Sequence, residues 1–210
     1  FYVNPPFKSC ASPSTYDLRL ERPNDPAGQP SVVFYRFEQP LPPQPPQCAV
    51  PNPIPKLLAV GEDRVVYVIT NSRTVKALKD WTNDGIADEM QQFQLPTSLQ
   101  LPLDGTLADS EMGECLVTLH AGMLPALERL VVSFDSNGDG FIDAGGQLIV
   151  PVGVPGLPRI GGPKALAVDA CTGRVFVCGT LSSDPTKTAV IFYEDTGYLD
   201  DVDTLQTRDG

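Results

Sequence analysis

The sequence has little of what several protein classes require. It contains one histidine, and its five cysteines include no Cys-x-x-Cys pair, so we expect no structural zinc site. No apolar run approaches the roughly 18 residues of a membrane span, so we expect no direct span. Basic residues are few: 15 Lys and Arg face 26 Asp and Glu, with a formal net charge of −11. Because phosphate neutralisation needs basic surface, we expect no nucleic-acid partner.

Recognisable catalytic motifs are also missing. The chain has no GxSxG elbow, no HExxH, no Walker loop and no dinucleotide fingerprint. Its single histidine, His120, has no acidic neighbour in the sequence, and a lone histidine of this kind is more often structural than catalytic. We therefore predict a non-enzymatic protein with no catalytic residue.

Proline and glycine are abundant, with 22 and 18 residues in a chain of 210. This composition indicates many short elements separated by turns, which favours an all-β protein. Strand-like runs rich in β-branched and aromatic residues support this. They are Tyr16–Leu20, Ser31–Phe37, 57–60, 64–70, Thr74–Leu78, Cys115–Leu119, Arg129–Phe134, 165–168, 174–180 and Ala189–Tyr193.

Two regions are expected. Residues 1–50 comprise N-terminal strands and a proline-rich connector, and residues 51–210 a β-repeat, calcium-binding domain. The segment QPLPPQPPQ at 39–47 is typical of polyproline II, either as a plain connector or as a ligand for a proline-recognition domain.

The second region repeats a cycle of three strands, an acidic loop and an apolar stretch broken by proline. Its acidic loops begin at residues 80, 135 and about 194, so the period is roughly 55 residues. Such a period predicts a propeller-like array of roughly four antiparallel β-repeats, complete or partial, whose units stack to bury their faces. The middle copy departs from the cycle, because LHAGMLPALER replaces a clear hairpin.

Two of the acidic loops match position by position. The first loop is Asp80–Asp88 and the second loop is Asp135–Asp143. Both carry oxygen-bearing side chains at positions 1, 3, 5 and 9, a main-chain carbonyl at position 7 and glycine at position 6. The candidate metal ligands are Asp80, Thr82, Asp84, Ile86 and Asp88 in the first loop and Asp135, Asn137, Asp139, Phe141 and Asp143 in the second.

Calcium prefers six to eight hard oxygen ligands, and each loop supplies about five. We therefore predict two calcium ions, one in each loop, at strand ends. The alternative is a polar β-turn in which Asp and Asn cap their own backbone. A third acidic segment, which contains Asp195 and Asp200, lacks an acid at position 1, so we expect no third ion.

The loops resemble those of EF-hand and dockerin proteins, with two departures. Position 12 is Gln91 or Gly146, so the closing acid is missing, and the preceding residues TVKALK and RLVVSF indicate strands rather than helices. They are more similar to the calcium loops of integrin-type FG-GAP propeller blades. The stretch VYVITNSRTVKALKDWTNDGIADE also resembles blades of the soluble sugar-dehydrogenase (glucose/sorbosone) propellers. These resemblances span residues 56–201 and imply a β-propeller fold with calcium at strand ends.

The favoured function is a non-catalytic, calcium-stabilised structural or interaction module, extracellular, at the cell surface or periplasmic. Exposed strand edges predict other protein subunits or a homo-assembly as partners. The alternative, implied by the resemblance, is a fragment or relative of a secreted quinoprotein sugar-dehydrogenase propeller. The chain begins with Phe1 rather than methionine, as expected after removal of a signal peptide or for a fragment.

The cysteines are expected to form disulfides in an oxidising compartment. Cys10 and Cys48 flank the proline-rich segment and could staple it. If Thr172-Gly173 is a hairpin turn, Cys171 and Cys178 stand about 13 Å apart along the hairpin. That exceeds the ~7 Å limit for a disulfide, so these two should not bond. The odd cysteine is either free or intermolecular.

Overall fold

The computed structural model describes residues 2–4, 15–20, 31–38, 55–61, 64–110, 113–121, 129–152, 160–169, 174–181, 183–193 and 206–209. Within these ranges the regular elements are all β-strands, which confirms the expected all-β class. No helix there is long and apolar enough to cross a membrane. The strands are β1 Tyr2–Asn4, β2 Thr15–Leu20, β3 Val32–Glu38, β4 Pro55–Val60, β5 Val66–Thr70, β6 Thr74–Lys79, β7 Glu89–Gln94, β8 Pro102–Ser110, β9 Gly113–His120, β10 Arg129–Phe134, β11 Gly146–Pro151, β12 Ile160–Asp169, β13 Arg174–Leu181, β14 Thr188–Tyr193 and β15 Gln206–Asp209.

The strands form four antiparallel sheets in which chain neighbours pair. The first sheet has the order β1-β2-β3, the second β4-β5-β6-β7, the third β11-β10-β9-β8 and the fourth β12-β13-β14-β15. In the second and third sheets, the acidic loop connects the third strand to the fourth. The apolar stretches expected after the loops, Gln91–Leu95 and Gln147–Val152, overlap these fourth strands, β7 and β11, which were not predicted as strands.

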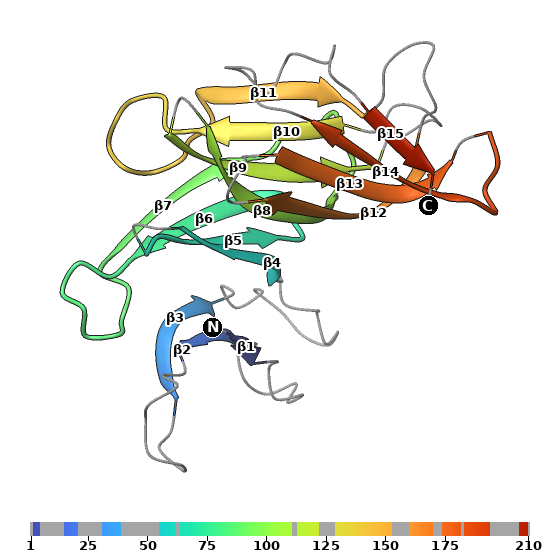
Figure 1. Cartoon of the computed structure of the whole chain (residues 1–210). Coiled ribbons are helices and arrows are strands. Elements are labelled where there is room, and N and C mark those ends of the chain that lie inside the picture. The colour runs from blue at the N-terminus through green and yellow to red at the C-terminus, as the bar shows by residue number, and fades with distance from the viewer. Residues whose placement is uncertain are drawn as a thin grey trace.

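The sheets stack face to face, as Figure 1 shows. Strand β5 explains why, because residues on both of its faces are buried. Val66 and Val68 pack with residues of the first sheet. Tyr67 and Ile69 point the other way and pack with residues of the third sheet. Alternation of side chains along a strand therefore buries both faces of the second sheet.

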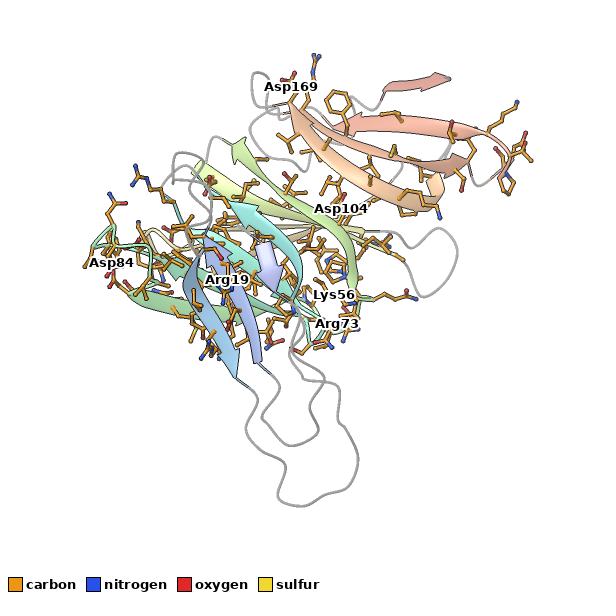
Figure 2. The ribbon with its side chains drawn as sticks, turned by 90° about the horizontal axis from the view of Figure 1, so that it is seen from below. Arg19, Lys56, Arg73, Asp84, Asp104 and Asp169 are labelled. Atoms are coloured by element: carbon orange, nitrogen blue, oxygen red, sulfur yellow. The ribbon has the colours of Figure 1, made fainter. Side chains whose placement is uncertain are left out.

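The third sheet is buried on both faces in the same way. Leu116 of β9 and Val131 of β10 join the cluster shared with the second sheet. Their neighbours Val117 and Val132 join a cluster with Leu166 and other residues of the fourth sheet. A polar link crosses this interface, because the Leu166 amide donates to Asp104 Oδ2 at 2.9 Å. Figure 2 shows Asp104 on β8, close to the fourth sheet.

The first and fourth sheets lie at opposite ends of the stack in both views (Figures 1 and 2). The described strands therefore form an open stack rather than a closed ring. Leu18, Phe34 and Phe37 of the first sheet share a hydrophobic cluster with β5 and β6. The proline-rich segment 39–47 lies outside the described residues.

The third sheet corrects one expectation. The middle repeat does contain a hairpin, made by β8 and β9, with Ser110 paired to Gly113. The segment LHAGMLPALER instead covers the end of β9 and the connection to β10, of which residues 122–128 lie outside the described ranges. Strand β8 was not predicted because its sequence, PLDGTLADS, contains proline, glycine and two aspartates, all depleted in strands. Pairing along β9 overrides that weak local preference.

Candidate metal centres

The two acidic loops occupy equivalent places in adjacent sheets. The first loop joins β6 to β7, and the second joins β10 to β11. In Figure 1 both project from the same side of the stack, and Figure 2 shows Asp84 at the edge of the molecule. Each loop is closed by its position 9 amide: Asp88 donates to Lys79 O at 2.9 Å, and Asp143 to Phe134 O at 3.3 Å.

The first loop folds around the carboxylate at position 1. Asp80 Oδ1 accepts the amide of Asn83 at 2.6 Å, and its Oδ2 accepts that of Gly85 at 2.8 Å. At position 5, Asp84 Oδ1 accepts the amide of Ile86 at 2.8 Å. Two carboxylates thus accept hydrogen bonds from three backbone amides within residues 83–86.

The second loop repeats these bonds position by position. Asp135 Oδ1 accepts the amide of Gly138 at 2.7 Å, and its Oδ2 accepts that of Gly140 at 2.8 Å. Asp139 Oδ1 accepts the amide of Phe141 at 2.9 Å. The two loops therefore have the same local backbone course, although the side chains at their other positions differ.

The backbone dihedral angles of the two loops also agree at equivalent positions. Position 4 is left-handed in both loops, with φ of 62° at Asn83 and 77° at Gly138. Position 6 is also left-handed, with φ of 94° at Gly85 and 85° at Gly140. Glycine and asparagine tolerate this region best, as the sequence predicts for a sharp turn around a cation.

Three oxygen-bearing side chains converge in the first loop. Thr82 donates its amide to Asp88 Oδ2 at 2.9 Å, and its hydroxyl donates there at 3.1 Å. The same hydroxyl lies 3.4 Å from Asp80 Oδ1. The backbone hydrogen bond from Thr82 is the main reason that the pKa of Asp88 lies below its usual value. Positions 1, 3 and 9 are therefore neighbours in space.

The second loop closes somewhat differently. Asp143 accepts the amide of Ser136 at 3.1 Å and its hydroxyl at 2.8 Å, so its partner is position 2 rather than 3. Burial alone would raise the pKa of Asp143, but hydrogen bonds from Ser136 and the glycines at 145 and 146 outweigh it and lower the pKa. Asn137 Nδ2 lies 3.2 Å from Asp139 Oδ2, which brings positions 3 and 5 together.

Among the described residues, no group of three or more His, Cys, Asp and Glu side chains converges as a metal site. The hydrogen bonds explain this, because the aspartates turn several of their oxygens towards backbone amides. The donor set in each loop is nevertheless made of carboxylate, hydroxyl or amide, and carbonyl oxygens. Hard divalent cations prefer such donors, and softer metals do not.

The two loops are anchored to the preceding sheet through the amide at position 8. Ala87 donates to Phe34 O of the first sheet at 3.0 Å. Ile142 donates to the Tyr67 hydroxyl of the second sheet at 3.3 Å. Tyr67 is buried, and this burial, with the negative charge of Glu114, Asp135 and Asp139 nearby, raises its pKa to about 12 against the opposing effect of the Ile142 bond. Each loop thus fastens its own sheet to its neighbour.

Two further contacts of the loops were not predicted. Gln91, on β7, donates to Asp139 Oδ2 at 3.2 Å and links the second sheet to the second loop. Arg64 donates to Asn83 Oδ1 at 2.7 Å across the first loop. Nothing in the sequence identifies these pairs, because they depend on how adjacent hairpins approach each other.

Trp81, at position 2 of the first loop, is 57% exposed. Its indole N–H donates to Glu89 Oε2 at 2.7 Å, and Lys79 Nζ lies 4.0 Å from the ring centroid. The ring is therefore held by its own hairpin, on the surface.

His120 has a structural environment. The side chain is buried, Nδ1 lies 2.8 Å from Gln100 O, and Nε2 lies 2.9 Å from Thr118 Oγ1. Burial lowers the pKa of the imidazole, against the effect of the Gln100 bond. Both ring nitrogens are thus engaged in the interior of the third sheet.

The cysteines in the described ranges do not form a disulfide there. Cys115 is buried and lies 3.2 Å from the carbonyl of Ala108, and Cys178 carries a free thiol. Cys10, Cys48 and Cys171 lie outside those ranges, as does the third acidic segment with Asp195. The predicted staple and the absence of a third ion remain predictions.

Comparisons with protein-family models, with curated proteins and with solved structures found no match to this chain. Its function is therefore argued from its own residues.

Proposed function

We propose that this chain is a calcium-stabilised, non-catalytic structural or interaction module of an exported protein assembly. One ion would bind in each acidic loop, and the stacked sheets would belong to a propeller-like array. The assembly would be extracellular, at the cell surface or periplasmic, where calcium is available and disulfides such as one between Cys10 and Cys48 can form.

The observation that carries the proposal is the repetition of one loop geometry in two adjacent sheets. A polar β-turn needs only one capping side chain. Here each loop places three carboxylates within nine residues, at positions 1, 5 and 9, around two left-handed residues. Like charges placed in this way repel one another, as Asp143 does Asp139, and a divalent cation relieves that repulsion. The short hydrogen bonds described above hold the loop backbone ready for the ion.

The ligands would be the side-chain oxygens at positions 1, 3, 5 and 9 and the carbonyl at position 7. In the first loop these are Asp80, Thr82, Asp84, Asp88 and the carbonyl of Ile86. In the second they are Asp135, Asn137, Asp139, Asp143 and the carbonyl of Phe141. The ion supplies positive charge and fixes loop shape. Because position 8 of each loop bonds to the preceding sheet, a fixed loop holds two sheets together.

Isothermal titration calorimetry tests this proposal. The full chain, freed of metal with a chelator and then dialysed, should bind two equivalents of calcium. Asp84→Ala and Asp139→Ala should each remove one equivalent and leave the other. Asp184→Ala is the matched control, because Asp184 also caps a turn, with Thr186, but lies outside both loops. Absence of calcium binding by the unaltered chain would contradict the proposal.

A further inference from the structure

The side chain at position 12 of the first loop reaches across to the second loop. This residue is Gln91 on β7, and its Nε2 donates to Asp139 Oδ2 at 3.2 Å. The other oxygen of Asp139 accepts the amide of Phe141 at 2.9 Å, within the second loop itself. The carboxylate at position 5 of the second loop is therefore held from two sides, and one of these is the strand that follows the first loop.

Lys79 makes a second link between the loops. It immediately precedes Asp80, and its carbonyl oxygen accepts the amide of Asp88, the residue at position 9. Its Nζ lies 4.0 Å from the ring centroid of Trp81 and 5.9 Å from that of Phe141. An ammonium group within about 6 Å of an aromatic ring is attracted to the face of that ring. Lys79 therefore interacts with position 2 of the first loop and with position 7 of the second.

The second loop has no side chain at its own position 12. Gly146 stands there, and a Cβ atom on it would lie 2.6 Å from Phe134 Cδ2 and 2.7 Å from the Phe134 carbonyl oxygen. Close packing against β10 therefore excludes a side chain at this position. Of the two loops, the first alone makes a link through position 12, and that link is directed to the second loop.

The charge of the loops permits both ions to bind together. Each loop carries three carboxylates, at positions 1, 5 and 9, so a loop that holds one divalent ion still has a net negative charge. An occupied first loop therefore does not repel a cation that approaches the second. Salt screens the remaining interaction between the ions, because both loops are at the surface. Hydrogen bonds and packing between the loops, rather than charge repulsion, should then set the sign of any coupling.

We propose that the two loops bind calcium cooperatively, so that an ion in the first loop raises the affinity of the second. This inference rests on the calcium binding proposed above. An ion in the first loop fixes Asp88, and through the Asp88 amide it fixes Lys79 and the start of β7. Gln91 then holds the Asp139 carboxylate in place before the second ion arrives, so less conformational freedom is lost when that ion binds. By thermodynamic linkage, an ion in the second loop raises the affinity of the first by the same factor.

Calorimetric titration of the metal-free full chain with calcium measures this coupling. Asp139→Ala gives the association constant of the first loop alone, and Asp84→Ala gives that of the second. The product of the two stepwise association constants of the unaltered chain should exceed the product of these two single-loop constants at least about threefold, as expected of one exposed hydrogen bond.

A matched pair of glutamine variants separates the coupling from the charge that each aspartate variant removes. The three titrations are repeated in the Gln91→Ala background and in the Gln92→Ala background, neither of which changes any charge. Gln92 is exposed on the same strand, and alternation of side chains places it on the opposite face. Gln91→Ala should lower the excess about threefold or more, whereas Gln92→Ala should leave it unchanged.

The outcomes separate this inference from the proposed function. An equal excess in the two glutamine backgrounds would overturn the coupling and leave both calcium sites in place. A product of stepwise constants in the unaltered chain that does not exceed the product of the single-loop constants would do the same. An unaltered chain that takes up no calcium would overturn both the coupling and the proposed function.

Discussion

The second loop buries the residues at its positions 7 and 8, whereas the first loop leaves position 7 in solvent. Phe141 and Ile142 are 2% and 3% exposed and belong to the cluster between the second and third sheets. Ile86 is 51% exposed, and Ala87 is only partly buried, against the first sheet. The oxygen positions of the loops are nevertheless the same.

Because of this difference, we expect the two loops to bind the same cation but to stabilise different parts of the molecule. The donor oxygens are matched, so we expect both loops to bind the same cation. Phe141 and Ile142 of the second loop belong to the hydrophobic cluster between the second and third sheets. An ion bound there should therefore stabilise the whole stack of sheets. The first loop bonds to the smaller first sheet through one backbone hydrogen bond, from Ala87 to Phe34. Its ion should act more locally.

The largest effect is expected from truncating position 7. Phe141→Ala removes a buried ring between two sheets and should lower the free energy of unfolding by about 3–5 kcal/mol. Ile86→Ala, at the same position of the first loop, should change it by less than about 0.5 kcal/mol. Urea denaturation measures both. Equal losses would show that the loops are anchored alike.

The next effect concerns the calcium dependence of stability. At free calcium a hundred times its dissociation constant, one site contributes about 2.7 kcal/mol. Asp139→Ala should remove more of the calcium-induced rise in the global melting midpoint than Asp84→Ala does, because the second loop is tied to the core. Differential scanning calorimetry of the two variants, with and without calcium, makes this comparison. A larger loss in Asp84→Ala would mean that the first loop, rather than the second, contributes more to the calcium-dependent stability of the whole chain.

Tyr67 provides a pH-dependent test of the second loop. Tyr67→Phe leaves the Ile142 amide without its acceptor and should cost about 1–2 kcal/mol near pH 7. In the unfolded chain, tyrosine ionises near pH 10, whereas burial raises the pKa of Tyr67 to about 12 in the folded chain. The unfolded state therefore loses a proton first, and this contribution to stability, present below pH 10, is lost as pH rises towards 12.

The free energy of unfolding, measured from pH 9 to pH 12, checks the direction of this effect. Over that range the free energy of unfolding should fall by about 2 kcal/mol more in the unaltered chain than in Tyr67→Phe. The other titrating groups of the two proteins are the same. Parallel pH profiles for the two proteins would mean that Tyr67 is not buried behind the second loop.

The smallest effects are expected from the polar contacts around the loops. Gln91→Ala removes the bond to Asp139, and Arg64→Ala removes the bond to Asn83. Both contacts are exposed, so each variant should lose no more than about 1 kcal/mol. Gln91→Ala should affect the second loop and Arg64→Ala the first, as amide hydrogen exchange within each loop can show.

Local pattern was sufficient to predict most of the strands and both loops. Alternating or continuous β-branched residues mark strands such as β5 and β10, and acids with glycine at fixed spacing mark the loops. Strand β8 was missed because only its partner β9 makes PLDGTLADS a strand. The exposure of Trp81 and the bond between Gln91 and Asp139 depend on the spacing of neighbouring hairpins. No single stretch of sequence encodes that spacing.

Thermal unfolding of the metal-free chain, with calcium and then with excess chelator, tests the central claim most directly. A shift of 1 kcal/mol moves the midpoint of a chain of this size by about 2–4 °C. Two occupied loops should therefore raise the midpoint by several degrees, reversibly, and magnesium should raise it less. An unchanged midpoint in saturating calcium would contradict the assignment of both loops as calcium sites.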